Sequence, residues 1–176
     1  MLFSKLKELS YDKDSDRINV ESIVEILPVC PIEIINDIYA DHGRKAEFQA
    51  EYGNVDISKL HWKLMEFTGK ELIESSIIPE FLQWVLTCKK KLNDFNTDGW
   101  ECISNIKTIE DSWNTNKTWL KPPYFFDPNV LAISKNNLHL VEGHTRLGIL
   151  MGLINKKIVS PTMTHKVWLG KINGNY

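Results

Sequence analysis

Four side chains that can do chemistry lie within five positions near the end of the chain: Glu142, His144, Thr145 and Arg146, with Gly143 between the first two. A carboxylate and an imidazole can both move protons, and a carboxylate can also help to hold Mg²⁺. A guanidinium offers a fork of donors that matches a phosphate group. The cluster therefore predicts a site for a phosphate-bearing ligand, with Glu142 and His144 as catalytic candidates and Glu142 as a candidate magnesium ligand.

The residues on either side indicate how this cluster is positioned. An apolar run at 138–141 is typical of a buried strand, and apolar residues over 147–154 recur at the spacing of one helix face. The cluster then forms the turn that enters a helix, where backbone N–H groups have no partner within the helix and the helix dipole is positive. A phosphate can bind there, and Gly143, His144, Thr145 and Arg146 are the expected binding residues.

Two local roles follow from this arrangement. Gly143 allows a sharp turn and a close approach of the ligand to the backbone. Thr145 is expected to cap the helix through its hydroxyl group. Because any junction between a strand and a helix needs a glycine and a cap, a purely structural turn is the alternative interpretation.

The segment from Val141 to Arg146 resembles the signature of the ParB/sulfiredoxin superfamily, in which a strand, a short turn and a helix hold nucleotide phosphates. It is most similar to the ADP-dependent free serine kinase branch, whose turn reads Asp-Gly-His-His-Arg. The acid of that motif falls on Glu142, the glycine on Gly143, the first histidine on His144 and the arginine on Arg146, whereas the second histidine is replaced by Thr145.

The other branches match less well. ParB proteins carry Gly-Glu-Arg-Arg, of which only Gly143 and Arg146 are present. The reactive cysteine of sulfiredoxins falls on His144, so sulfiredoxin chemistry is not expected. The resemblance covers residues 118–172 and implies a nucleotide ligand (ATP, ADP or CTP), Mg²⁺, and either phosphotransfer or nucleotide hydrolysis by a kinase or NTPase.

Composition limits the class of protein. A chain of 176 residues with 43% hydrophobic and 25% charged residues is expected to form a single soluble domain over residues 1–176. We expect no membrane span, because no run approaches about 20 apolar residues, and no signal peptide. The cysteines, Cys30, Cys88 and Cys102, lie far apart, which favours reduced thiols in the cytoplasm and argues against structural zinc.

Charge is distributed unevenly along the chain. Residues 115–176 carry eight Lys or Arg and two acids, a net charge of +6, so residues 1–114 carry −8 of the total of −2. The sequence thus divides into a mainly helical acidic part, 1–114, and a basic part, 115–176, that contains the motif. A positive field around the motif favours a phosphate-bearing ligand.

The predicted fold is α+β, with a mostly helical N-terminal two-thirds packed on a small mixed β-sheet. Residues 17–27 and 59–67 are ambiguous between strand and helix. Thr68 and Glu71 have the spacing of a capping box, and Pro79 is expected to start a new helix. A further helix is predicted from Trp100 through Trp113.

The basic part is predicted to be mostly strands. Extended segments are expected at Pro122–Phe126, Val130–Ile133 and Thr164–Leu169, with a hairpin turn at Asn136 and Asn137. Aromatic residues lie near the motif, and we expect them to pack in the core, with stacking on a base as the alternative. They are Trp119, Tyr124, Phe125 and Trp168.

Two other functions are compatible with the sequence. A non-enzymatic bacterial protein of the immunity or antitoxin type could bind a basic partner protein through its acidic part. A ParB-type DNA-associated protein is less favoured, because the overall charge is slightly acidic and no helix-turn-helix segment is evident.

Overall fold

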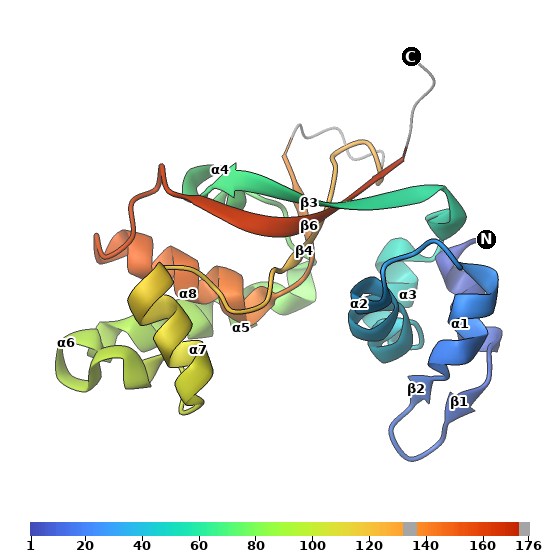
Figure 1. Ribbon diagram of the computed structural model, residues 1–176, viewed down its shortest axis with the longest axis horizontal. Helices are drawn as coiled ribbons and strands as arrows, with labels where there is room; N and C mark the ends of the chain where they lie inside the picture. The colour runs from blue at the N-terminus through green and yellow to red at the C-terminus, as the bar shows by residue number, and fades with distance from the viewer. Residues whose placement is uncertain (132–136, 173–176) are drawn as a thin grey trace. The chain divides into compact units, whose positions relative to one another are not determined.

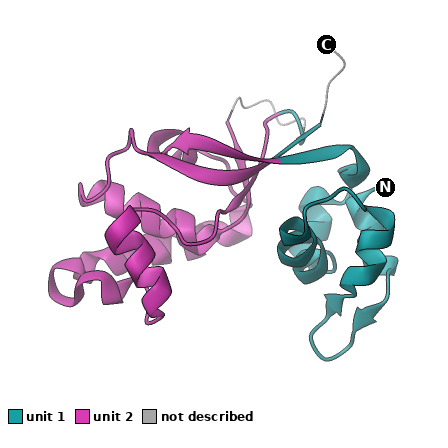
Figure 2. Ribbon diagram, viewed as in Figure 1, with its two compact units in different colours: residues 1–62, 129–133, 170–176 teal, residues 63–128, 134–169 magenta. Residues whose placement is uncertain are grey.

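The computed structural model describes residues 1–131 and 137–172, which form two compact units (Figure 2). Within these residues, unit 1 comprises 1–62, 129–131 and 170–172, and unit 2 comprises 63–128 and 137–169. Both helices and strands are present, which confirms the mixed α+β class (Figure 1). None of the helices in the described part of the chain is both long enough and apolar enough to cross a bilayer.

Unit 1 consists of a small antiparallel hairpin and short helices around an aromatic core. Its core contains Phe3, Tyr39, Phe48 and Tyr52, and the ring of Phe3 packs against those of the other three at centroid distances of 6.1–6.5 Å. The regular elements are β1 (Tyr11–Asp12), β2 (Arg17–Ile18), α1 (Val20–Ile26), α2 (Ile32–Ile34) and α3 (Ala46–Tyr52), with 3-10 helices at Phe3–Glu8 and Ile57–Lys59 and a π-helical turn at Ile35–Ala40.

The ambiguity over residues 17–27 is resolved in two pieces. Only Arg17 and Ile18 form a strand, and a helix follows from Val20. The hairpin turn is closed by the Asp12 carboxylate, which accepts hydrogen bonds from the backbone N–H groups of Asp14 and Ser15 at 2.8 and 3.2 Å. These bonds lower the pKa of the Asp12 carboxyl group.

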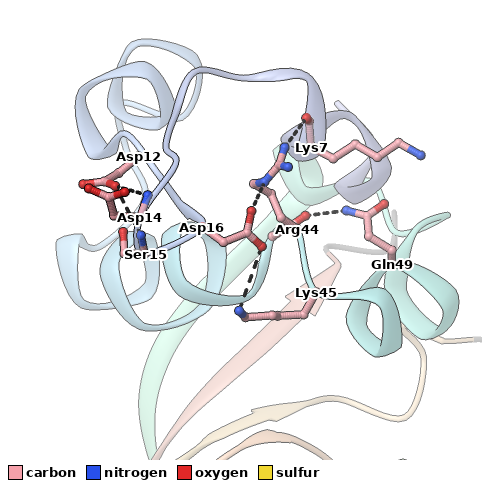
Figure 3. Close-up of polar contacts among 9 residues, drawn as sticks. Lys7, Asp12, Asp14, Ser15, Asp16, Arg44, Lys45 and Gln49 are labelled. Carbon is pink, nitrogen blue, oxygen red and sulfur yellow. Dashed lines mark hydrogen bonds and ion pairs between the residues drawn. The ribbon is translucent and has the colours of Figure 1, made fainter.

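Arg44 holds this hairpin in place (Figure 3). Its Nε donates to Oδ1 of Asp16 at 2.7 Å, and its Nη1 donates to the carbonyl oxygen of Lys7 at 3.0 Å. The guanidinium also lies 3.5 Å from the centre of the Tyr11 ring. This side chain therefore ties the hairpin and the residues just before it to a position 28 to 37 residues later in the chain.

Unit 2 combines most of a four-stranded sheet with the longer helices. The strand order is β3 (Leu60–Thr68), β6 (Thr164–Ile172), β4 (Tyr124–Phe126) and β5 (His139–Glu142). β4 and β5 are antiparallel, with Phe125 opposite Leu140 and Phe126 opposite His139. The helices are α4 (Gly69–Ile73), α5 (Pro79–Lys91), α6 (Phe95–Asp98), α7 (Lys107–Asp111) and α8 (His144–Asn155), with 3-10 helices at Leu92–Asp94 and Gly99–Cys102 and a π-helical turn at Ser112–Asn116.

Several local predictions are confirmed, and one ambiguity is resolved. The segment 59–67, for which the sequence left strand and helix open, is mainly strand β3. Thr68 and Glu71 form the expected capping box at the start of α4, and Pro79 occupies the first turn of α5. The extended segment expected at Thr164–Leu169 lies within β6, where His165 and Val167 are buried while Lys166 is exposed.

Two predictions of secondary structure are wrong. The segment from Trp100 to Trp113 is not one continuous helix. A 3-10 helix ends at Cys102, and α7 then continues into the π-helical turn that contains Trp113. The interruption lies where the Ser104 hydroxyl accepts a hydrogen bond from the N–H of Ile106 at 3.1 Å and stabilises a turn. Val130 and Leu131 lie in a turn instead of a strand. The rest of that predicted strand, Ala132 and Ile133, and Asn136 of the predicted hairpin turn lie outside the described residues.

Helices α5 and α8 pack closely against each other. A Cβ atom added at Gly148 of α8 would lie 2.5 Å from the carbonyl oxygen of Val85 and 2.7 Å from Cβ of Cys88. The absence of a side chain at this position therefore lets the two backbones approach, and this contact fixes α5 beside the start of α8.

Candidate functional site

The predicted strand, turn and helix are present in unit 2. β5 ends at Glu142, Gly143 lies between the two elements, and α8 begins at His144. Gly143 has φ of +110°, a backbone conformation that side chains other than glycine rarely adopt. A Cβ atom at this position would also lie 2.4 Å from Cβ of Pro123. The turn therefore requires glycine for two independent reasons.

Thr145 does not cap α8, contrary to the prediction. Gly143 is the N-cap residue, and no side chain forms a capping hydrogen bond to the first turn. Thr145 lies too far inside the helix to cap it, and its hydroxyl accepts a hydrogen bond from Nε1 of Trp84 at 2.9 Å. The first turn of α8 consequently has no capping side chain of its own.

Arg146 is already engaged by protein groups. Its Nη2 forms an ion pair with the Glu142 carboxylate, and its Nη1 donates to the carbonyl oxygens of Lys121 and Pro122 at 2.9 and 3.4 Å. The Arg146 and Glu142 side chains are 22% and 26% exposed, so solvent reaches both. The Glu142 carboxylate therefore partly neutralises the charge that Arg146 could offer to a bound anion.

His144 is more buried than Glu142, Thr145 and Arg146. The residue is 8% exposed, and its ring centroid lies 4.5 Å from that of Phe81 on α5 at an interplanar angle of 47°. This packing fixes the ring against α5. Its backbone N–H belongs to the first turn of α8 and can contribute to anion binding without moving the ring.

The turn lies between two clefts, both within unit 2. The first has a volume of about 450 Å³ and brings Lys121 and Arg146 together beside an apolar wall. Trp113 and Trp119 belong to that wall, with their rings edge-on to each other at 5.9 Å. The second has a volume of about 400 Å³ and is lined by Phe81, Trp84, Glu142, His144 and Thr145. Glu142 and Thr145 thus border both clefts.

Phe81, Trp84 and Lys121 line these clefts but were not predicted as site residues. The aromatic pair on α5 could have been noticed, because residues three apart lie on the same face of a helix. Of the aromatic residues named beside the motif, Trp119, Tyr124 and Phe125 are buried in the core, as expected.

Among the residues that the structure describes, Glu142 is the only one with a carboxylate that lines either cleft. In the described part of the chain, no three His, Cys, Asp or Glu side chains are grouped so that they could hold a metal ion. Since Mg²⁺ is often bound by one or two carboxylates together with substrate phosphates, Glu142 fits a magnesium ion only in the company of a phosphate ligand. The thiols of Cys30, Cys88 and Cys102 are free, and burial raises the pKa of Cys30 to about 12.

The geometry brings all five motif residues to one place in unit 2. Gly143 and Arg146 border the first cleft, His144 borders the second, and Glu142 and Thr145 border both. The arrangement is suited to an anion at the helix start, with a larger group in one of the clefts. Comparison of the chain with protein-family models, with curated proteins and with solved structures finds no match.

Proposed function

We propose that the chain is a ParB/sulfiredoxin-like protein that binds a nucleotide, such as ATP, ADP or CTP, through its phosphates at the start of α8. The observation that carries the proposal is the first turn of α8, which has no side-chain cap and lies between two clefts with Arg146 beside it. Backbone N–H groups at such a helix end are natural partners for phosphate oxygens.

Each motif residue has a role in this proposal. The backbone N–H groups of His144, Thr145 and Arg146 bind phosphate oxygens, and the glycine allows the phosphate to approach. Arg146 neutralises charge on the phosphate, which is the interaction that matters most if the phosphoryl group is transferred. Glu142 then holds Mg²⁺ together with the phosphates or accepts a proton.

The enzymatic version of the proposal is phosphotransfer or hydrolysis. An acceptor hydroxyl or a water molecule forms the new P–O bond, the bond to the leaving nucleotide breaks, and the acceptor's proton passes to Glu142. His144 is held by Phe81 and positions the phosphate through its backbone. The acceptor class stays open in this proposal.

The ion pair between Arg146 and Glu142 must rearrange for this to happen. Partly exposed pairs of this kind contribute about 0.2–1 kcal/mol, so a doubly charged phosphate can replace the carboxylate as the partner of Arg146. The same exchange releases Glu142 for its role as base or metal ligand.

Calorimetry with ADP, ATP and CTP, each with and without Mg²⁺, tests the proposal. We expect micromolar to millimolar binding that weakens at least about tenfold in Arg146→Ala, since charged hydrogen bonds contribute about 1.5–3 kcal/mol. Arg146→Lys keeps the charge but lacks the fork, so it should show an intermediate loss. Lys156→Ala, just beyond the other end of α8, is the matched control. Absence of heat with all three nucleotides would overturn the proposal.

A further inference from the structure

Trp84 is unusually exposed for a tryptophan. All six tryptophans lie in the described part of the chain, and Trp84 is the most exposed of them, with 52% of its surface open to solvent. Aromatic side chains of this size normally contribute to the core, whereas ligand-binding clefts are lined mainly by apolar and aromatic side chains. Trp84 lines such a cleft, and about half of its surface is open to solvent.

The Trp84 ring is held in a defined position. Its Nε1 donates to Oγ1 of Thr145 at 2.9 Å, which ties the ring to the second residue of α8. The tight packing at Gly148 fixes the backbone of α5 relative to α8. The indole is therefore pre-positioned beside the turn that would hold the phosphate, and it forms part of the 400 Å³ cleft.

We propose that this cleft binds the base of a nucleoside phosphate, with the planar base stacked on the indole of Trp84. The inference rests on the proposed phosphate site at the start of α8. Stacking of a base on an aromatic side chain is tolerant of base identity and contributes substantially to affinity. Purines offer more ring area than pyrimidines, so ADP should bind more tightly than CDP.

The larger cleft is less suited to the base, although it also contains tryptophans. Trp113 and Trp119 are only 1% and 5% exposed, and their rings meet edge to face at 90°. They leave little open ring face for stacking. Lys121 and Arg146 instead give that cleft a cationic end suited to the phosphates.

Calorimetry with ADP, CDP and inorganic pyrophosphate separates the base from the phosphates. Wild-type protein should bind ADP more tightly than CDP, and at least about tenfold more tightly than pyrophosphate. Trp84→Leu should weaken ADP binding about 5- to 100-fold and leave pyrophosphate binding unchanged. Leu82→Ala, on the same helix, exposed and outside the cleft, is the matched control and should change neither.

A second variant tests whether the base contacts Trp84, and it keeps the inference testable if Trp84→Leu does not fold. Trp84→Phe keeps a ring for stacking but removes the indole, so it should retain most of the ADP affinity. ADP should quench tryptophan fluorescence in the wild type, and this quenching should disappear in Trp84→Phe. Thermal unfolding of each variant shows whether the fold is retained.

The possible failures are distinguishable. If pyrophosphate binds and Trp84→Leu binds ADP as the wild type does, the base does not stack on Trp84, and the phosphate site stands without this inference. Should Trp84→Leu fail to fold, persistence of the quenching in Trp84→Phe would overturn the inference. If the wild type binds neither pyrophosphate nor ADP, the phosphate site itself is wrong and the stacking inference falls with it.

Discussion

The guanidinium of Arg146 forms an ion pair with the carboxylate of Glu142, four residues earlier, across the turn that starts α8. These two residues are also the cation and the acid of the proposed site. The carboxylate therefore occupies the position that an incoming phosphate would take beside Arg146. In the proposed site, a ligand would need enough charge to displace the carboxylate from Arg146.

Removing the carboxylate charge should strengthen phosphate binding. In Glu142→Gln, Arg146 loses its competing partner, and we expect the affinity for pyrophosphate measured without Mg²⁺ to rise, by up to about fivefold. Calorimetry at low and moderate salt gives the affinity and its dependence on charge. Glu66→Gln on the exposed part of β3 makes the same change of charge elsewhere in unit 2 and is the control. An unchanged or lower affinity in Glu142→Gln would contradict the competition.

The close packing of α5 and α8 should make Gly148 intolerant of substitution. Alanine is favoured over glycine inside a helix by about 1 kcal/mol, but the added Cβ would lie 2.5 Å from the Val85 carbonyl oxygen. We expect Gly148→Ala to lower the free energy of unfolding by about 1–3 kcal/mol, since overpacking outweighs helix propensity here. Urea denaturation measures this, with exposed Asn155→Ala at the end of α8 as the control. A stabilised Gly148→Ala would show that the helices can separate without penalty.

The parts of the fold that local sequence determines were predictable. The capping box of Thr68 and Glu71 and the start of α5 at Pro79 depend on residues within one helical turn. The passage from β5 into α8 depends on the apolar pattern on either side of Gly143. Each of these features depends on residues close by in the sequence, so the secondary structure that it predicts does not depend on distant parts of the chain.

Parts of the site that depend on tertiary packing were not predictable. Trp84 lies 61 positions before Thr145, its hydrogen-bond partner, and only the packing of α5 on α8 brings the two together. That contact also gives the Thr145 hydroxyl a different role from the expected cap. The ion pair from Glu142 to Arg146 was not predictable from helix spacing, because Glu142 ends β5 and only Arg146 lies in α8.

Arg44 should stabilise unit 1 specifically. Arg44→Met keeps an apolar stem but loses the hydrogen bonds to Asp16 and the Lys7 carbonyl and the contact with the Tyr11 ring. We expect faster backbone hydrogen exchange in the hairpin formed by β1 and β2, with exchange in α8 unchanged. Lys13→Met, in the turn of the same hairpin, is the control because it is exposed. Equal acceleration in α8 would show that the hairpin is coupled to unit 2.

Two buried histidines should make the protein less stable in mild acid. Burial lowers the pKa values of His139 and His165 from 6.5 to about 4. His139 pairs through Nδ1 with the Ser76 hydroxyl at 2.8 Å, and His165 with the Thr118 hydroxyl at 2.9 Å. Between pH 6.5 and about 4 the unfolded chain binds more protons than the folded one. Stability is therefore full above pH 6.5 and is lost as the pH falls towards 4, by about 1–3 kcal/mol for each histidine.

Replacing each histidine isolates this effect from that of the carboxylates. His165→Gln and His139→Gln retain a hydrogen-bonding side chain but cannot gain a proton in this range. Each variant should therefore lose less stability than the wild type between pH 7 and pH 5, measured by urea denaturation at several pH values. His61→Gln, at an exposed position of β3, should follow the wild-type curve because its ring is not buried. A variant curve parallel to that of the wild type would mean that the buried ring accepts a proton without penalty.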